Sequence, residues 1–212
     1  MRIGKDDSIM ILENKVQEFK INHSTNLRNI NIVVKVFTTD PSLLITYYNY
    51  EKTSGLCQNG CKNFGNKWSC PPFSKKYVDI SSAYKYCYLI LMYTNLEAFS
   101  DITNKYLRVK AANAILKSKC EKMARTYEDQ CGGYSLLSGS CRLCQTCAKK
   151  RDLACRKPDK IRYSMEATGL DVEAICEEHF GHKLLWYSSP NKLPLYTSAV
   201  CCVLSKDNCL DI

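Results

Sequence analysis

The sequence predicts an α/β or α+β fold in which a mixed sheet, flanked by helices, carries two cysteine-rich metal-binding loops. Three observations lead to this prediction. Strand-like and helix-like segments interleave along the chain, as in folds that pack helices on a sheet. Residues 86–93 are continuously apolar, as expected of a strand buried on both faces. Seven of the fourteen cysteines fall in two loops, over 57–70 and 141–155.

Three elements are predicted before the first cysteine loop. An amphipathic helix is expected over 8–20, and a strand is expected over 30–37, where β-branched residues dominate. A helix is expected to begin at the Asp-Pro-Ser sequence of 40–42 and to run to about Glu51. Gly55 is expected to end that helix, which leaves the first cysteine loop without regular structure.

The second half of the chain shows the clearest helix. Over 101–129 the apolar positions follow a 4-3-4-3 spacing, which gives one apolar face, and we interpret the basic opposite face as a solubility feature. Gly132 ends this helix, and a further helix is expected from an N-cap at Asp171 to Gly181. The remaining predicted strands cover 134–137, 183–187 and 195–204.

Length and composition indicate a globular protein. The 212 residues are 45% apolar and 24% charged, and we divide them into an N-terminal extension, 1–40, packed on a single cysteine-rich metal-binding domain, 41–212. The net charge of +9 is scattered, so we expect no nucleic-acid partner. We see no secretion signal and no apolar run long enough to span a membrane. We therefore expect a cytoplasmic protein with reduced thiols, whose cysteine clusters bind metal.

The second loop carries the strongest signal, because Cys141, Cys144 and Cys147 are spaced by three and Cys155 follows. Thiolates are soft ligands, and a four-iron cluster takes one thiolate at each iron. A zinc site is the less favoured alternative, since zinc sites usually pair two Cys-x2-Cys knuckles across a longer loop. Cys155 either completes the cluster of its own loop or serves a second cluster elsewhere.

The first loop offers Cys57, Cys61 and Cys70, one thiol short of a closed four-iron site. If Cys155 stays with its own loop, a cluster held here has one iron without a cysteine, and such an iron is open to a substrate atom as a Lewis acid. If Cys155 crosses over, the cluster of the first loop is closed instead. The alternatives for this loop are a structural zinc site or inert thiols. We expect Trp68 to shield the cluster of this loop from water.

The remaining candidates have weaker signals. Cys131 precedes a Gly-Gly pair near the second loop and is a further candidate for a missing ligand. Glu166 is either an acid–base group near a cluster or, as we favour, an ion-pair partner of Arg156 or Arg162. The histidines at 179 and 182 are expected to cap a helix C-terminus as cations. The other cysteines that we expect in regular elements, as small buried hydrophobes, are Cys87, Cys120, Cys176, Cys201 and Cys202.

At these residues the chain resembles a prokaryotic family of uncharacterised, cysteine-rich proteins regarded as metal-binding. The resemblance runs from about residue 50 to the C-terminus and rests on four motifs. These are Cys-x3-Cys followed by Trp-Ser-Cys-Pro-Pro within 57–72, Cys-x2-Cys-x2-Cys-Ala at 141–148, Cys-Arg-x-Pro at 155–158, and Ser-Met-Glu-Ala-x-Gly-Leu-Asp-Val at 164–172. The resemblance implies metal binding through those cysteines and implies no particular reaction.

The sequence leads to three hypotheses about function. The first is a protein with one or two 4Fe–4S clusters that transfers electrons or carries out cluster-dependent redox chemistry, in a cell at low oxygen. The second is an enzyme whose open iron acts as a Lewis acid on a small substrate, in the manner of a desulfidase or hydratase. The third is a zinc-held interaction module. The partner is accordingly a redox protein or a small-molecule substrate.

Overall fold

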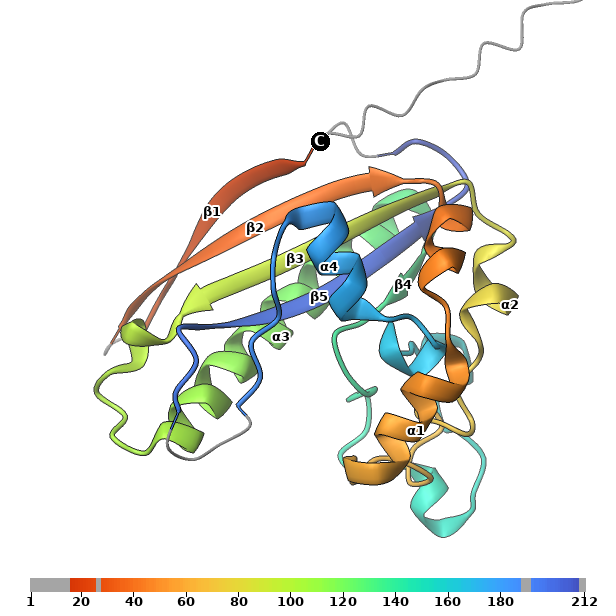
Figure 1. Ribbon diagram of the computed structural model, residues 1–212. Helices are drawn as coiled ribbons and strands as arrows, with labels where there is room; N and C mark the ends of the chain where they lie inside the picture. The colour runs from red at the N-terminus through yellow and green to blue at the C-terminus, as the bar shows by residue number, and fades with distance from the viewer. Residues whose placement is uncertain (1–15, 26–27, 188–191, 210–212) are drawn as a thin grey trace, which may run out of the picture.

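A computed structural model describes residues 16–25, 28–187 and 192–209, and its centre is a five-stranded sheet (Figure 1). Every pair of neighbouring strands is antiparallel, and the spatial order is β1-β2-β3-β5-β4. Helices pack against this antiparallel sheet, so the fold is α+β, one of the two expected classes. The strands are β1 (Gln17–Ser24), β2 (Asn29–Thr39), β3 (Tyr86–Asn95), β4 (Tyr134–Leu136) and β5 (Tyr196–Ser205).

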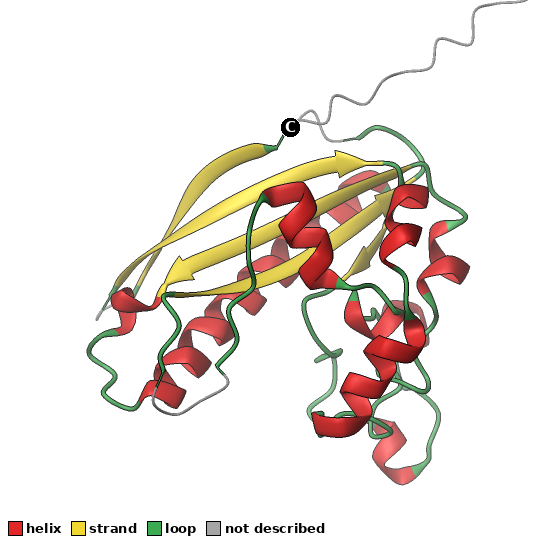
Figure 2. Ribbon diagram, viewed as in Figure 1, coloured by secondary structure: helices red, strands yellow, loops and turns green. Residues whose placement is uncertain are grey.

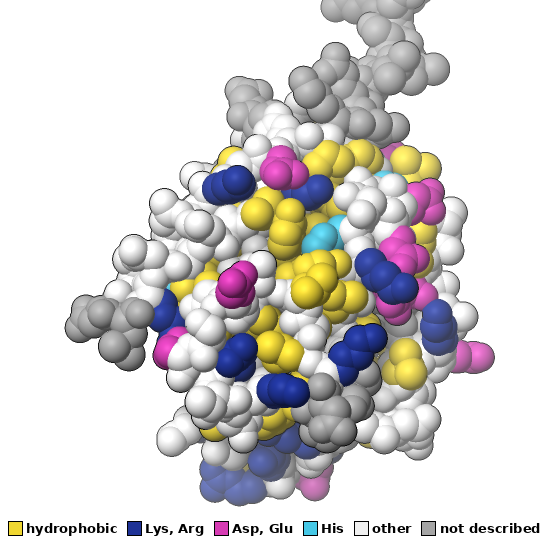
Figure 3. Space-filling model, turned by 60° about the vertical axis from the view of Figure 1, so that its left-hand side comes forward, with side chains coloured by type: hydrophobic (Ala, Val, Ile, Leu, Met, Phe, Trp, Pro, Cys, Tyr) yellow, Lys and Arg dark blue, Asp and Glu magenta, His cyan; other side chains and the backbone are white. Residues whose placement is uncertain are grey.

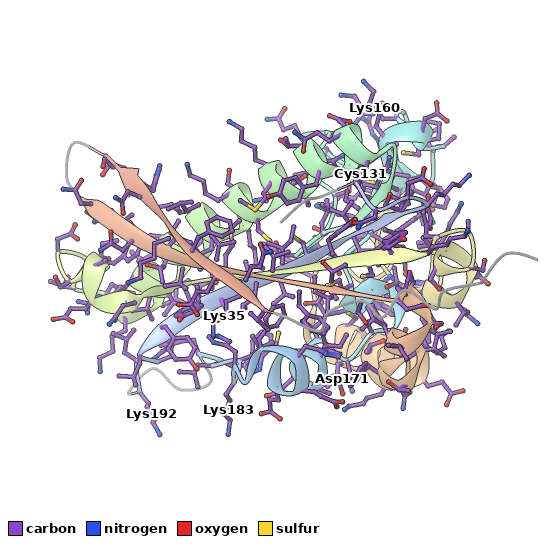
Figure 4. All side chains as sticks on the ribbon, turned by 90° about the horizontal axis from the view of Figure 1, so that it is seen from above. Lys35, Cys131, Lys160, Asp171, Lys183 and Lys192 are labelled. Carbon is purple, nitrogen blue, oxygen red and sulfur yellow. A yellow bond between two sulfur atoms is a disulfide. The ribbon has the colours of Figure 1, made fainter. Side chains whose placement is uncertain are left out.

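Helices cover both faces of the sheet. The long helix α3 (Lys105–Cys131) packs on one face and α4 (Val172–Phe180) on the other, as Figures 2 and 4 show. Alternate residues of β3 enter the two cores, because successive strand side chains point to opposite faces. Tyr88, Ile90 and Met92 pack in the α3-side core, whereas Cys87, Leu89 and Leu91 pack in the other. The prediction of a strand buried on both faces is therefore confirmed.

The N-terminal part of the described chain is strand rather than helix. Most of the helix expected over 8–20 lies outside the described residues, and its described end belongs to β1, which pairs with β2 from Gln17 opposite Val36 to Ser24 opposite Asn29. The strand expected over 30–37 is confirmed as β2. Cross-strand hydrogen bonding outweighs the weak helical pattern of the sequence here. Since β2 also pairs with β3, residues 29–39 form part of the central sheet.

The connection between β2 and β3 contains the first cysteine loop. Asp40 caps the expected helix start by accepting a hydrogen bond from the Ser42 amide at 2.7 Å. The helix then breaks into two, η1 (Pro41–Tyr47) and α1 (Tyr50–Gly60), because Asn49 caps a new start. The prediction that Gly55 ends this helix is wrong. Gly55 lies inside α1, since one helical glycine costs only about 1 kcal/mol of stability. Cys57 therefore lies on a helix. The short helix α2 (Tyr77–Ser81) follows.

The later helix boundaries agree with the capping residues in the sequence. Gly132 ends α3 in the left-handed conformation, with φ of 55°. Asp171 caps α4, which ends at Gly181 with φ of 57°. The expected strand over 183–187 is not formed; Leu184 instead packs in the α4-side core. The short 3-10 helices that complete the fold are η2 (Leu96–Phe99), η3 (Ala148–Arg151), η4 (Pro158–Lys160) and η5 (Glu166–Thr168).

On one face of the molecule, charged side chains are spread out rather than gathered in one stripe. On the face shown in Figure 3, Lys and Arg alternate with Asp, Glu and apolar side chains. The net charge of +9 therefore does not produce a continuous basic face in this view.

The two histidines near the end of α4 are packed among aromatic rings, which corrects the expectation that they cap the helix as cations. His179 stacks on Phe37 with ring centroids 4.7 Å apart. His182 is buried between Tyr93 and Tyr196, and its Nε2 lies 2.9 Å from the Ser198 hydroxyl. Burial lowers the pKa of both histidines, and the nearby Lys35 charge lowers the pKa of His182 further.

These lowered pKa values predict a loss of stability in acid. The unfolded chain takes up the histidine protons near pH 6.5, about the ordinary value, whereas the folded chain takes them up at lower pH. The unfolding free energy should therefore fall as the pH drops below about 6.5. Urea unfolding of the wild-type protein and of His182→Gln at pH 7.5 and 5.5 measures this. The variant should lose less stability on acidification, and an equal loss would rule out His182 as a contributor.

Candidate metal centre

The second cysteine loop, which lies between β4 and α4 in the sequence, surrounds a small cavity. Four half-buried thiols line this cavity. They belong to Cys141, Cys144, Cys147 and Cys155. Cys155 thus lies with the three cysteines of its own loop. We call this the four-cysteine cavity.

Positive charge surrounds the four-cysteine cavity. Lys67, Arg156 and Lys157 are among the residues that line it. Arg156 and Lys157 also hold the loop, since they donate hydrogen bonds to the carbonyl oxygens of Thr146 and Leu143. Four thiolates around a cluster give a net negative charge, which neighbouring cations stabilise. The soft ligands and the charge both fit a four-iron cluster.

A half-buried ion pair anchors the chain beyond Cys155. The guanidinium of Arg162 forms a bidentate pair with the carboxylate of Glu128 near the end of α3. Glu128 also accepts a hydrogen bond from the Ser135 amide of β4 at 3.0 Å. Two parallel hydrogen bonds fix the orientation of the guanidinium relative to the carboxylate as well as the distance between them. The pair therefore fixes the exit of the second loop relative to α3 and the sheet.

The three thiols of the first loop line a different and larger cavity, of about 480 Å³. Cys57 lies on α1, Cys61 follows its last turn, and Cys70 comes after a turn in which Gly65, at φ of 66°, donates its amide to the Pro71 carbonyl. Cys70 is buried, Cys57 is half-buried and Cys61 is exposed. We call this the three-cysteine cavity.

Two thiols of the three-cysteine cavity, those of Cys57 and Cys70, have a pKa above that of free cysteine in the metal-free chain. Burial raises the pKa of Cys70 to about 11. Burial also raises the pKa of Cys57, and the neighbouring Cys61 and Glu166 raise it further. Loss of these protons on metal binding is therefore opposed at Cys57 and Cys70, so metal affinity should rise with pH.

Glu166 lines the three-cysteine cavity as well. The expectation that it pairs with Arg156 or Arg162 is wrong, because Arg156 binds the Thr146 carbonyl and Arg162 binds Glu128. Among the described residues, the carboxylate of Glu166 forms no ion pair and no hydrogen bond. It is therefore available for proton transfer in this cavity.

The two cavities share a wall, formed where two chain segments cross. Lys67 Nζ donates to the Ser140 hydroxyl and to the Cys141 carbonyl, each at 3.0 Å. The Ser69 hydroxyl accepts a hydrogen bond from the Cys141 amide, also at 3.0 Å. Ser69 and Cys141 line the four-cysteine cavity, whereas the adjacent Cys70 and Ser140 line the three-cysteine cavity. Figure 1 shows the two loops side by side below one end of the sheet.

Trp68 belongs to the opposite cavity from the one expected. It lines the four-cysteine cavity, and its indole N–H donates to the Leu153 carbonyl at 2.9 Å. The Lys149 ammonium lies 5.2 Å from the Trp68 ring centroid and 4.3 Å from that of Phe73. The indole therefore shields the centre of the second loop and helps to join the two loops.

Residues 164–171 fix Glu166 relative to α1. The Asn49 amide donates to the Gly169 carbonyl at 2.8 Å, and the Asp171 amide donates to the Tyr47 carbonyl at 2.9 Å. Gly169 has φ of 106°, and a Cβ at this position would lie 2.6 Å from the Tyr48 ring. Only glycine fits both constraints. The motif at 164–172 thus holds the start of the Cys57 helix.

Cys131 is not the missing ligand. It forms a disulfide with Cys209, close to the end of α3 (Figure 4 labels Cys131). This disulfide also differs from the expectation that all thiols are reduced. The five cysteines expected as buried hydrophobes are all fully buried. Among them, the sulfurs of Cys120 and Cys201 lie 2.8 Å apart across the α3–β5 interface.

Each thiol set surrounds its cavity instead of meeting at one point. Among the residues that the structure describes, no three His, Cys, Asp or Glu side chains form a group able to hold a single metal ion. The sequence interpretation found all seven cysteines that line the two cavities but missed Lys67 and Ser69, which join them. The only feature of the sequence that points to these two residues is their position one and three residues before Cys70.

Replacing Gly169 tests the position of α1. Gly169→Ala forces a side chain into a left-handed conformation and against the Tyr48 ring, and should lower the unfolding free energy by about 1–3 kcal/mol. The control is Gly55→Ala, because its Cβ meets nothing within 4 Å inside α1 and should raise stability by about 0.5–1 kcal/mol. Urea midpoints compare the two, and equal stability of Gly169→Ala and the wild type would contradict the account.

Alkylation of the metal-free protein tests the burial of Cys70. With a pKa of about 11, about one Cys70 thiol in a thousand is ionised at pH 8, so iodoacetamide should modify the exposed Cys61 first. The rate at Cys70 should increase about tenfold per pH unit up to pH 11. Mass spectrometry of the peptides measures both rates. Equal alkylation rates of Cys61 and Cys70 at pH 8 in the folded chain would contradict the burial of Cys70. In urea, where the chain is unfolded, the two rates should become equal.

Comparison with known proteins identifies a family. The model of a family described as "Predicted metal-binding protein (DUF2284)" matches residues 48–204, which contain both cysteine loops and the 164–172 motif. No curated protein and no solved structure matches the chain. In the described residues, no helix is long and apolar enough to cross a membrane. Because the family model covers most of its length, the chain belongs to the DUF2284 family of predicted metal-binding proteins.

Proposed function

We propose that the protein is a cytoplasmic electron carrier with two four-iron clusters. Cys141, Cys144, Cys147 and Cys155 hold one cluster with a thiolate on every iron. The three cysteines of the first loop hold the other, which has one iron free of cysteine. The observation that carries the proposal is the division of the seven cysteines into sets of four and three that line separate cavities.

The arrangement of the four thiols favours a cluster over zinc. A single zinc ion holds all of its sulfurs about 2.3 Å from the metal. Among the described residues, no three Cys, His, Asp or Glu side chains come together in this way. A four-iron cluster spreads its thiolates over four metal atoms and therefore suits thiols that line a cavity without meeting at one point. A zinc-held interaction module is the less favoured reading for the same reason.

The shared wall supports electron transfer between the two centres. Ser69 and Cys70 are consecutive residues that line different cavities, and so are Ser140 and Cys141. The hydrogen bond from the Cys141 amide to the Ser69 hydroxyl joins the two segments directly. A short path through bonds and one hydrogen bond thus connects the two thiol sets. A redox protein at low oxygen would be the external partner.

A second candidate function is catalysis at the three-cysteine cavity. An iron without a cysteine ligand supplies Lewis acidity when the cluster is bound. Glu166, which is half-buried and has no ion-pair partner among the described residues, would give or take a proton at its carboxylate oxygen. Removal of sulfur or water from a small substrate needs both contributions. The large cavity favours this candidate over closure of the site by a further protein ligand.

Metal analysis under anaerobic conditions tests the two-cluster proposal. The wild-type protein should be brown and contain about eight iron and eight sulfide ions per chain. Cys144→Ala and Cys61→Ala should each lose about half of the iron, because each removes a ligand from one centre. The control Cys201→Ala alters a buried thiol far from both loops in sequence and should keep all the iron. A colourless zinc protein, or equal iron in all variants, would contradict the proposal.

Electron paramagnetic resonance separates the two candidate functions. An added small thiol should shift the signal of the reduced protein if one iron is open to ligands. In Cys144→Ala, which keeps the first centre, the shift should persist, whereas in Cys61→Ala it should be absent. A signal that added thiol never changes would sink the catalytic candidate and leave the electron carrier.

A further inference from the structure

A third cavity adjoins the three-cysteine cavity and extends it along α3. This neighbouring cavity has a volume of about 360 Å³ and lies between one side of α3, the start of β5 and residues 184–187. Residues common to both cavities are Lys117, Ser138, Glu166, Val172 and Trp186. Because they share these residues, the two cavities form one elongated groove. Its inner end lies at Cys57, Cys61 and Cys70.

The groove has a mostly apolar wall. Phe64, Leu170 and Val172 line it near the cysteines, and Tyr106 and Val109 line its outer half. Trp186 lies at the junction and is 67% exposed. An exposed indole on the rim of a groove offers a flat apolar surface that a bound molecule would cover. The groove is thus suited to an elongated ligand with an apolar body.

Lys117 supplies the polar contact at the junction. It is half-buried and lines both cavities, and a Cβ on Gly139 would lie 3.9 Å from its ammonium. Among the described residues, its ammonium forms no ion pair and no hydrogen bond. Three carboxylates line the groove, Glu166, Asp171 and Glu173; Asp171 is paired with Lys52, and none of the three is paired with Lys117. Moving an ammonium out of water without a partner is unfavourable, so an anionic ligand group at this point is stabilised.

From this arrangement we propose that the groove binds a small monocarboxylic acid with an aromatic or aliphatic body. The ligand carboxylate pairs with Lys117 at the junction, and the apolar body lies against Trp186, Phe64 and Leu170. The other end of the ligand points along the inner half of the groove toward the three cysteines. The proposal names the substrate class of the second candidate function and rests on it for any reaction, but binding itself requires only the groove.

Calorimetry with defined probes tests the proposal. The anaerobic protein as purified is titrated with 3-phenylpropanoate, with the neutral 3-phenylpropanamide and with the cationic 3-phenylpropylamine. The acid should bind, and the amide and the amine should bind at least tenfold more weakly. Lys117→Met should weaken binding of the acid at least tenfold. The matched control is Lys122→Met, an exposed lysine of α3 that lines neither cavity, and it should bind like the wild type.

One further variant makes the result decisive. Trp186→Ala, at an exposed position, should fold normally and lose affinity for the acid. Equal binding of acid and amide, or an unchanged affinity in Lys117→Met, would overturn the proposal. Iron content is measured on the same samples. A protein with about eight iron ions that ignores the acid disproves the ligand class alone, whereas a protein without iron disproves the cluster proposal.

Discussion

The contact between the two cysteine loops is the constraint on which the rest of the site depends. Lys67 and Ser69 bind the backbone at Cys141, and Trp68 binds the Leu153 carbonyl. Three consecutive side chains of one loop thus satisfy polar groups of the other. Buried or half-buried backbone groups without partners are costly, so neither loop can shift independently. The two thiol sets are therefore held as one unit at a fixed separation.

The sheet holds the loops through a few strong local contacts. The first loop is anchored by the backbone hydrogen bonds between 47–49 and 169–171, where Gly169 allows a close approach to Tyr48. The second is anchored by the ion pair between Glu128 and Arg162. Both anchors connect the loops to segments next to the sheet rather than to each other. This division allows a rigid scaffold to present long, irregular loops, as metal centres require.

Charge is distributed differently in the two cavities. Cations line the four-cysteine cavity, where Arg156 and Lys157 also hold the loop backbone. The three-cysteine cavity instead combines Glu166 with the groove that leads past Lys117. A closed, cation-lined site suits an electron-storing centre, whereas an open cavity with a free carboxylate suits a reacting one. The two halves of the site thus fit complementary roles.

Much of this architecture was predictable, and the exceptions have physical causes. Caps such as Asp171 and Gly132 and the apolar run of β3 are local signals, so these elements were found. The break before Asn49 is accompanied by hydrogen bonds of Tyr47 and Asn49 to residues 169–171, which are distant in sequence, and α1 continues past Gly55 because one helical glycine costs little. The cysteine spacing indicated all seven candidate ligands. Three other features depend on contacts between segments that are distant in the sequence, which the spacing of the cysteines does not encode. They are the disulfide of Cys131, the contact of Trp68 with the second loop, and the pairing of Arg162 with Glu128 instead of Glu166.

The central claim is that seven cysteines hold two metal centres on either side of the Ser69–Cys70 and Ser140–Cys141 wall. Anomalous X-ray diffraction at the iron edge, from crystals of anaerobically purified protein, tests this claim most directly. The account predicts two separate iron peaks, one within the four-cysteine cavity and one at Cys57, Cys61 and Cys70. A single peak, or a peak at the zinc edge with none at the iron edge, would contradict it.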